Sequence, residues 1–213
     1  MLKLKICGMR RPEDIEMANR YKPDYIGFVF ADSPRKVSYE QAKELSELLS
    51  EDIVPVGVFV NEHMKLIVEL FKDGIIEMAQ LHGDEDEKYI RNLKDKSIEE
   101  TGKEISVINA IEIKDDADYD DELLKWRDSA SDYFILDSGK GSGKTFDWSL
   151  IDKESEFFKN SIFLAGGLNS ENLALAIEEF NPFAVDLSSS VETDGFKDEE
   201  KIKEIIEIME NYR

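Results

Sequence analysis

Cys7 and Asp137 have side chains suited to proton transfer, and each ends a short apolar run of the chain. The run at 2–7 alternates with a period of two, as does the run at 133–136. If both runs are strands that end at one cavity, a thiol and a carboxyl group can act there as paired base and acid. Two simpler roles remain open: Cys7 as a small buried residue, and Asp137 as the cap of the turn that follows it.

Glycines and serines after the last two apolar runs predict a phosphate site. Gly166 and Gly167 precede residues 169–171, which read Asn-Ser-Glu and favour a helix start. Backbone N–H groups at a helix start bind phosphate, and glycine lets the anion approach closely. Ser188 and Ser189 add further N–H and hydroxyl donors. The alternative is a glycine pair that serves only a tight turn.

Three more side chains are candidates for substrate contacts or support. Arg35 can hold a carboxylate through its two-pronged guanidinium, although an ordinary surface arginine fits the composition equally well. Gln80 and His82 are expected to support the site, and for His82 bracing the rim is favoured over touching substrate. His63 is expected to be solvated at a helix start. The two histidines lie far apart without HExxH or CxxC, so no metal site is expected.

These residues require a scaffold that brings eight strand ends together. Apolar runs typical of strands alternate with amphipathic helical stretches along the whole chain, which is the α/β signature. The expected strands are 2–7, 25–30, 54–60, 76–81, 105–109, 133–136, 162–165 and 184–187. The expected helices are 12–20, 39–49, 62–71, 86–93, 172–180 and 198–212, with a weak or irregular one after the fifth strand. Eight βα units fit residues 1–213 as a single-domain (β/α)8 TIM barrel, whose chemistry lies at the C-terminal strand ends.

Closure of such a barrel predicts an ion pair beneath the site. Leu4 and Ile6 should face the helices, so Lys5 and Cys7 point inward, where an unpaired charge is very costly. The eighth strand neighbours the first and carries Asp186. We therefore expect Lys5 to pair with Asp186, and we expect the nearby positive charge to lower the pKa of Cys7 from about 8.5.

Composition excludes several classes of partner. The chain has 48 Asp+Glu against 27 Lys+Arg and a formal net charge of −21, which makes nucleic acid and membrane surfaces unlikely partners. No apolar stretch reaches the roughly 18 residues that span a bilayer. A single cysteine and the absence of a signal-peptide pattern predict a cytoplasmic protein.

The stretch DSGKGSGKT at 137–145 fails the Walker A pattern, because Ser138 stands where glycine is needed. We interpret it instead as a mobile flap or an idle loop.

Several segments in this order resemble phosphoribosylanthranilate isomerase, the tryptophan-pathway enzyme family. They are KICGM at 5–9, GFVF at 27–30, SPRKV at 33–37, VGVFVN at 56–61, QLHGDE at 80–85, LDSGKGSGKTFDW at 136–148, LAGGLNSENL at 164–173, VDLSSSVE at 185–192 and GFKD at 195–198. KICG combined with GGL and VDxSS is specific, whereas each alone is weak.

The resemblance implies a cofactor-free Amadori rearrangement of N-(5-phosphoribosyl)anthranilate to 1-(2-carboxyphenylamino)-1-deoxyribulose 5-phosphate. Asp137 matches the family's general acid and Cys7 its general base. Arg35 matches the position used for the anthranilate carboxylate, and the last two loops match the phosphate cradle. The expected partner is this small phosphorylated substrate, with the chain a monomer or a homodimer.

Two departures and two alternative functions accompany the resemblance. Arg10 stands where the family often has threonine, and Ser190 stands where glycine is common, so its side chain could crowd a phosphate-binding N–H. The alternative functions are a sister phosphosugar enzyme on the same barrel, such as indole-glycerol-phosphate synthase or the histidine-pathway isomerase, and a non-catalytic metabolite-binding barrel. Cys7 on the first strand speaks against the histidine-pathway isomerase, which needs aspartate there.

Overall fold

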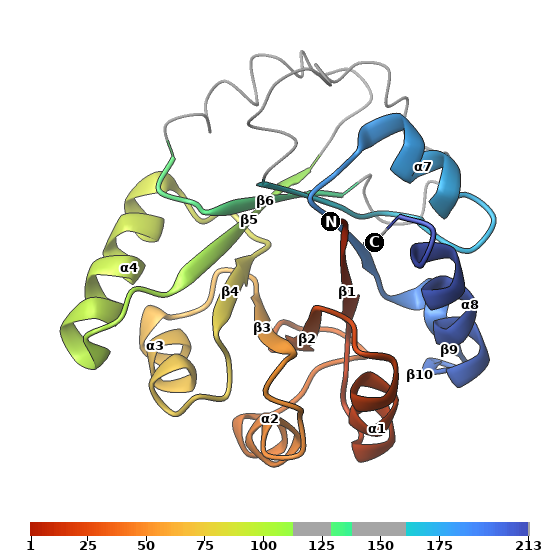
Figure 1. The fold of residues 1–213 in the computed structure, drawn as a ribbon. Helices are drawn as coiled ribbons and strands as arrows, with labels where there is room; N and C mark the ends of the chain where they lie inside the picture. Colours follow the sequence, from red (N-terminus) through yellow and green to blue (C-terminus); the bar gives the residue numbers. More distant parts are fainter. Residues whose placement is uncertain (113–128, 138–160, 213) are drawn as a thin grey trace.

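The computed structural model of the chain describes residues 1–112, 129–137 and 161–212. Within these residues eight parallel strands close into a barrel, in which β1 pairs with both β2 and β8 (Figure 1). The strands are β1 (Lys3–Cys7), β2 (Tyr25–Val29), β3 (Val54–Phe59), β4 (Met78–Leu81), β5 (Ser106–Glu112), β6 (Tyr133–Asp137), β7 (Ile162–Leu164) and β8 (Ala184–Leu187). The predicted (β/α)8 barrel is confirmed.

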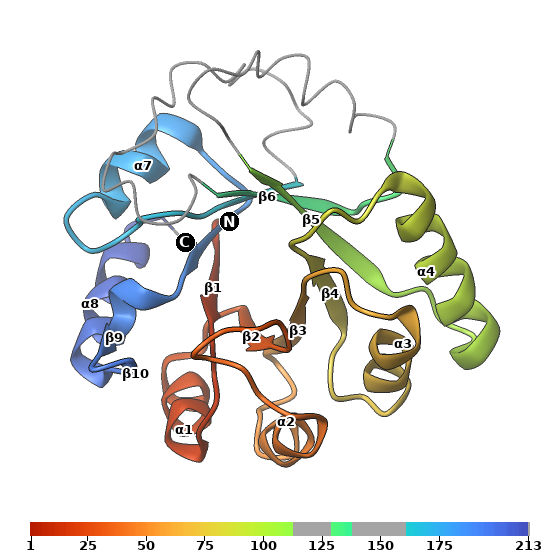
Figure 2. The ribbon, with the colours of Figure 1, turned by 180° about the vertical axis from the view of Figure 1, so that it is seen from behind.

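Helices lie around the outside of the strands in both views (Figures 1 and 2). They are α1 (Pro12–Tyr21), α2 (Tyr39–Ser46), α3 (Met64–Lys72), α4 (Glu87–Thr101), α7 (Leu173–Phe180) and α8 (Glu199–Met209). Side chains at several helix starts accept hydrogen bonds from orphan N–H groups: Ser38 caps α2, Asp86 caps α4 and Asp198 caps α8. These caps set where each helix begins relative to the strand before it.

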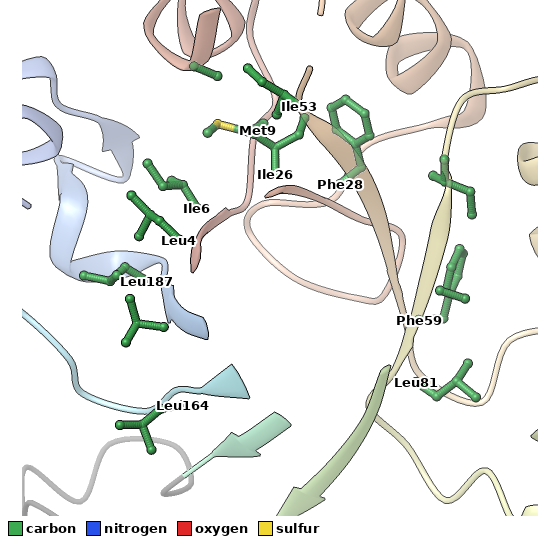
Figure 3. Packing of buried hydrophobic residues seen from close by; sticks show 14 of the residues in the cluster. Leu4, Ile6, Met9, Ile26, Phe28, Ile53, Phe59, Leu81, Leu164 and Leu187 are labelled. Carbon is green, nitrogen blue, oxygen red and sulfur yellow. The ribbon is translucent and has the colours of Figure 1, made fainter. Parts of the chain in front are cut away.

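The core has two layers because strand side chains alternate between the two faces of the sheet. Leu4, Ile6 and Leu187 belong to the outer layer, which packs between strands and helices (Figure 3). The inner layer fills the barrel and includes Tyr25 and Phe163, whose rings meet edge to face with centroids 5.3 Å apart. Since the interior is packed, the space for chemistry lies at the strand ends.

Some predicted boundaries are wrong for identifiable reasons. Helix α4 continues well beyond the predicted 86–93. The prediction ended too early because the second half of the helix is charged on the outside and lacks apolar periodicity. The helix ends at Gly102, whose φ of +74° closes it in the left-handed region. Strand β5 runs beyond the predicted 105–109 and pairs with β6 as far as the register of Glu112 with Asp137.

A small antiparallel hairpin after β8 was not predicted. It joins β9 (Glu192–Thr193) to β10 (Phe196–Lys197) and follows the short 3-10 helix η2 (Ser189–Val191). Asp194 and Gly195 form its turn with φ of +53° and +77°. Asp-Gly is a strong hairpin signal, so this element was detectable from the sequence.

Two expectations fall outside the described residues: the irregular helix after the fifth strand, and the flap beyond Asp137. Among the helices that the structure does describe, none has the length and apolar character needed to cross a membrane.

Candidate active site

Lys5 and Asp186 form the predicted ion pair inside the barrel. They occupy paired positions on β1 and β8, and Nζ of Lys5 lies 2.9 Å from Oδ2 of Asp186. The Lys5 side chain is fully buried. Burial opposes its charge, but Asp186 and Cys7 outweigh burial and raise the pKa of Lys5, so that it stays an ammonium ion.

Cys7 is buried at the end of β1, beside Val29 and Val58. Burial raises the pKa of the thiol and outweighs the positive charge of Lys5, which acts in the opposite direction. Lys5 does lower the pKa of Cys7, as expected. The expectation is wrong for the net shift, because burial raises this pKa by more. In the free protein Cys7 is a neutral thiol at neutral pH.

Asp137 ends β6 on the same inward face as Ile135, as predicted, and remains half-exposed. Its charge contributes to the raised pKa of Asp186, whose largest cause is burial, and Asp186 in turn raises the pKa of Cys7. Cys7 and Asp137 therefore both lie within electrostatic reach of Asp186. The structure brings the two candidate proton-transfer groups to one end of one barrel.

Gln80 and His82 connect to Asp137 through a chain of polar contacts. The amide nitrogen of Gln80 lies 3.1 Å from Nδ1 of His82. Because an amide nitrogen only donates, this contact places the ring proton on Nε2, which lies 3.7 Å from Oδ2 of Asp137. These contacts show how Gln80 and His82, both expected to support the site, can hold each other beside Asp137.

Arg35 already binds a carboxylate of the protein itself. Its Nε and Nη2 each donate to Glu192 at 2.7 Å, in a two-pronged ion pair across 157 positions of the chain. Lys197 donates to the same carboxylate at 2.8 Å. Sequence reasoning identified Arg35 but missed Glu192 and Lys197, which the unpredicted hairpin carries.

The helix predicted at 172–180 after β7 is confirmed as α7, which starts at Leu173. Gly166 and Gly167 have φ of +83° and +71° and lie in the turn between β7 and this helix. In the intervening turn Asn169 accepts hydrogen bonds from the N–H groups of residues 171 and 172. The N–H groups of both glycines have no partner among the described residues. The pair therefore offers free donors in the turn before α7.

The loop after β8 contains the predicted serines. The Ser188 hydroxyl donates to the carbonyl of Cys7 at 3.1 Å, and the Ser189 side chain is exposed. Ser190 lies in η2 outside the left-handed region, so this backbone does not require the glycine common at its position.

Arg10, the other departure, ties the rim together. Its guanidinium donates to the carbonyl of Pro34 at 2.8 Å and to that of Gly195 at 2.5 Å. It also lies over the Phe196 ring, 4.5 Å from the centroid. Arg10 therefore connects the loop that carries Arg35 to the hairpin.

Other features of the described residues contribute no competing site. A surface groove of about 660 Å³ between α3 and α4 contains none of the candidate residues except His63, which is exposed as expected. Within residues 1–112, 129–137 and 161–212, no three His, Cys, Asp or Glu side chains are grouped as metal ligands would be.

The similarity to known proteins extends over nearly the whole chain. The family model for N-(5'phosphoribosyl)anthranilate (PRA) isomerase matches residues 4–208. The N-(5'-phosphoribosyl)anthranilate isomerase of Clostridium acetobutylicum is 43% identical over 211 residues, covering 97% of each chain.

Solved structures of the same family have a similar fold. The phosphoribosyl anthranilate isomerase of Thermotoga maritima has a TM-score of 0.83 at 37% identity and covers 99% of this chain and 100% of its own. A structure of such an isomerase in complex with reduced 1-(o-carboxyphenylamino)-1-deoxyribulose 5-phosphate has a TM-score of 0.83 at 35% identity, with the same coverage. The chain belongs to the N-(5'-phosphoribosyl)anthranilate isomerase family.

Proposed function

We propose that the chain catalyses the Amadori rearrangement of N-(5-phosphoribosyl)anthranilate in tryptophan biosynthesis, with Asp137 as general acid and Cys7 as general base. The observation that carries the assignment is the placement of both groups at the C-terminal strand ends of one barrel, above the buried pair of Lys5 and Asp186. Family membership and the complex of a relative with a reduced product analogue support it.

Asp137 begins the reaction from its protonated form, by giving that proton to the furanose ring oxygen. The ring C–O bond breaks, and the nitrogen lone pair forms the C=N bond of an open-chain Schiff base. His82 presents Nε2 to the carboxyl group, and Gln80 fixes that tautomer. This arrangement orients Asp137 while its half-exposed side chain remains accessible to substrate.

Cys7 acts next in its thiolate form, after its own proton has passed to solvent: the thiolate removes the proton from C2′ of the Schiff base and becomes the thiol again. The electron pair of the broken C–H bond moves to form an enolamine, which tautomerises to the ketone. Burial disfavours a free thiolate, but the positively charged iminium lies next to the reacting carbon and makes that proton acidic when the base is needed. The Lys5 ammonium favours the thiolate further.

Binding uses the groups around these two residues. Arg35 takes the anthranilate carboxylate. The free N–H groups of Gly166 and Gly167, with Ser188 and Ser189, hold the phosphate.

The same proposal places the enzyme in the cytoplasm, because a single functional thiol suits a reducing compartment. A relative from Thermotoga maritima is described as dimeric, whereas for this chain monomer and homodimer remain alternatives.

The test is turnover of the fluorescent substrate, followed by decay of its emission. We expect Cys7→Ala and Asp137→Asn each to lower kcat at least about 10²-fold, the lower range for acid–base catalysis. Asp52→Asn is the control, because Asp52 pairs with Lys22 on the surface. No turnover by the wild-type chain would overturn the function, and full activity of either variant would overturn that residue's role.

A further inference from the structure

Arg35 uses only part of its donor set to bind Glu192. The contact is made through Nε and Nη2, which leaves the Nη1 hydrogens and one hydrogen on Nη2. Nη1 has no hydrogen-bond partner among the described residues. The edge of the guanidinium formed by its two terminal nitrogens is therefore available for a second carboxylate.

Glu192 is itself held in place. Lys197, whose side chain is fully buried, donates to its carboxylate at 2.8 Å, and Lys201 donates to its backbone carbonyl at 2.6 Å. The Glu192 carboxylate is also nearly buried. It is thus a fixed part of the hairpin, unlike a mobile surface acid that a substrate would displace.

The charges at this junction favour an anion. Burial would raise the pKa of Glu192, but hydrogen bonds from Arg35 and Lys197 outweigh it and lower the pKa to about 2. The carboxylate is therefore ionised at neutral pH, and the two cations and one anion sum to one positive charge. The hydrogen bond with Glu192 is the largest cause of the raised pKa of Arg35, and Cys7 adds to it, so the guanidinium lies within electrostatic reach of the reacting thiol.

The junction also reaches the loop after β8. Lys197 donates to the Ser188 carbonyl at 3.0 Å, and the Ser188 hydroxyl donates to the Cys7 carbonyl. Glu192 and Lys197 together therefore link Arg35 to the loop proposed for phosphate and, through Ser188, to the end of β1.

We propose that Glu192 is a positioning residue that holds Arg35 side-on, so that the free edge of the guanidinium selects a substrate carrying a carboxylate. The inference rests on the proposed function, which assigns the carboxylate to Arg35. Glu192 does not touch substrate; it acts through Arg35, and Lys197 keeps it in place.

The test measures binding of two stable ligands by calorimetry. The first is reduced 1-(o-carboxyphenylamino)-1-deoxyribulose 5-phosphate, and the second is the same molecule without the carboxylate. We expect Glu192→Gln to weaken the first about tenfold, the range for one charged hydrogen bond, and to change the second less than about twofold. In an Arg35→Met background the same substitution should have no further effect.

Glu199→Gln is the matched control, because Glu199 pairs with Arg20 on the surface. Equal weakening of both ligands would reveal a merely structural role and overturn the proposal, as would unchanged binding of the carboxylated ligand. If thermal denaturation shows Glu192→Gln unfolded, Glu192→Asp is measured in its place, with the same selective loss expected. Binding without turnover by the wild-type chain would refute the proposed function alone.

Discussion

Two opposing influences set the protonation of Cys7. Removal from water favours the neutral thiol, while the Lys5 ammonium favours the thiolate, and burial is the larger of the two. Asp186 adds to the effect of burial. A thiol that holds its proton in the free enzyme is protected from oxidation and alkylation, since only the thiolate is reactive.

We predict that the thiol of the wild-type protein titrates above its ordinary value of about 8.5. Because Cys7 is the single cysteine, its rate of alkylation by iodoacetamide reports this group alone. A raised pKa means that the thiolate fraction, and with it the rate, keeps rising with pH beyond that of a small free thiol.

Lys5→Met should move this titration further upward, because it removes the nearby positive charge. Lys3→Met is the control, since Lys3 pairs with Asp24 away from the thiol. A midpoint below about 8 in the wild type would contradict the dominance of burial.

Among the contacts between single residues, one ion pair could be predicted from the sequence and another could not. The pairing of Lys5 with Asp186 follows from strand alternation and barrel closure, which are regular. The pairing of Arg35 with Glu192 depends on how a loop and a hairpin far apart in the chain fold onto the same rim, and no periodicity encodes that arrangement. The proton on His82 is set by a neighbouring amide, which only coordinates reveal.

The turn after β1 leaves no room for a side chain at Gly8, because the Arg35 side chain packs against it. Gly8 has φ of +91°, and a Cβ built there would lie 2.5 Å from Cδ of Arg35. The backbone of this turn thus forms the surface against which the Arg35 side chain packs. Any larger residue would push the guanidinium off Glu192.

We predict that Gly8→Ala lowers kcat/KM at least about tenfold, the value of one charged hydrogen bond, because Arg35 must shift. Gly74→Ala is the matched control: Gly74 has φ of +71°, and its Cβ would meet nothing within 4 Å. Each substitution should cost about 1 kcal/mol of stability from the strained φ, measured by urea denaturation. A Gly8→Ala enzyme as active as Gly74→Ala would contradict the role of the turn.

Elements with strong periodicity were predictable, and elements defined by local turns were not recognised. The eight strands are short apolar runs with turns after them, so their existence followed from the sequence. The second half of α4 has a buried Lys94 held by Glu104 and Asp132, contacts that replace the apolar stripe on which the prediction relied. The hairpin has no periodicity to indicate it, and its Asp-Gly turn is the one local signal for it in the sequence.

The whole molecule repels the substrate that its site attracts. A net charge of −21 opposes a ligand with phosphate and carboxylate groups at long range. Lys5, Arg35 and Lys197 instead gather at the strand ends, where they pair with Asp186 and Glu192 and where Asp137 adds a third carboxylate. Composition indicated the repulsion, whereas this local gathering of cations needed the fold.

Capture of substrate should therefore respond weakly to salt. Raising sodium chloride from about 0.05 to 0.3 M shortens the Debye length to several ångströms, which screens the distant acidic surface more than the short contacts at Arg35. We predict that kcat/KM stays constant or rises slightly over this range. Chloride is the appropriate anion, because sulfate would compete for the phosphate donors. A steep fall of kcat/KM with chloride would show that long-range attraction drives capture, and that the cations at the strand ends dominate the field of the whole protein.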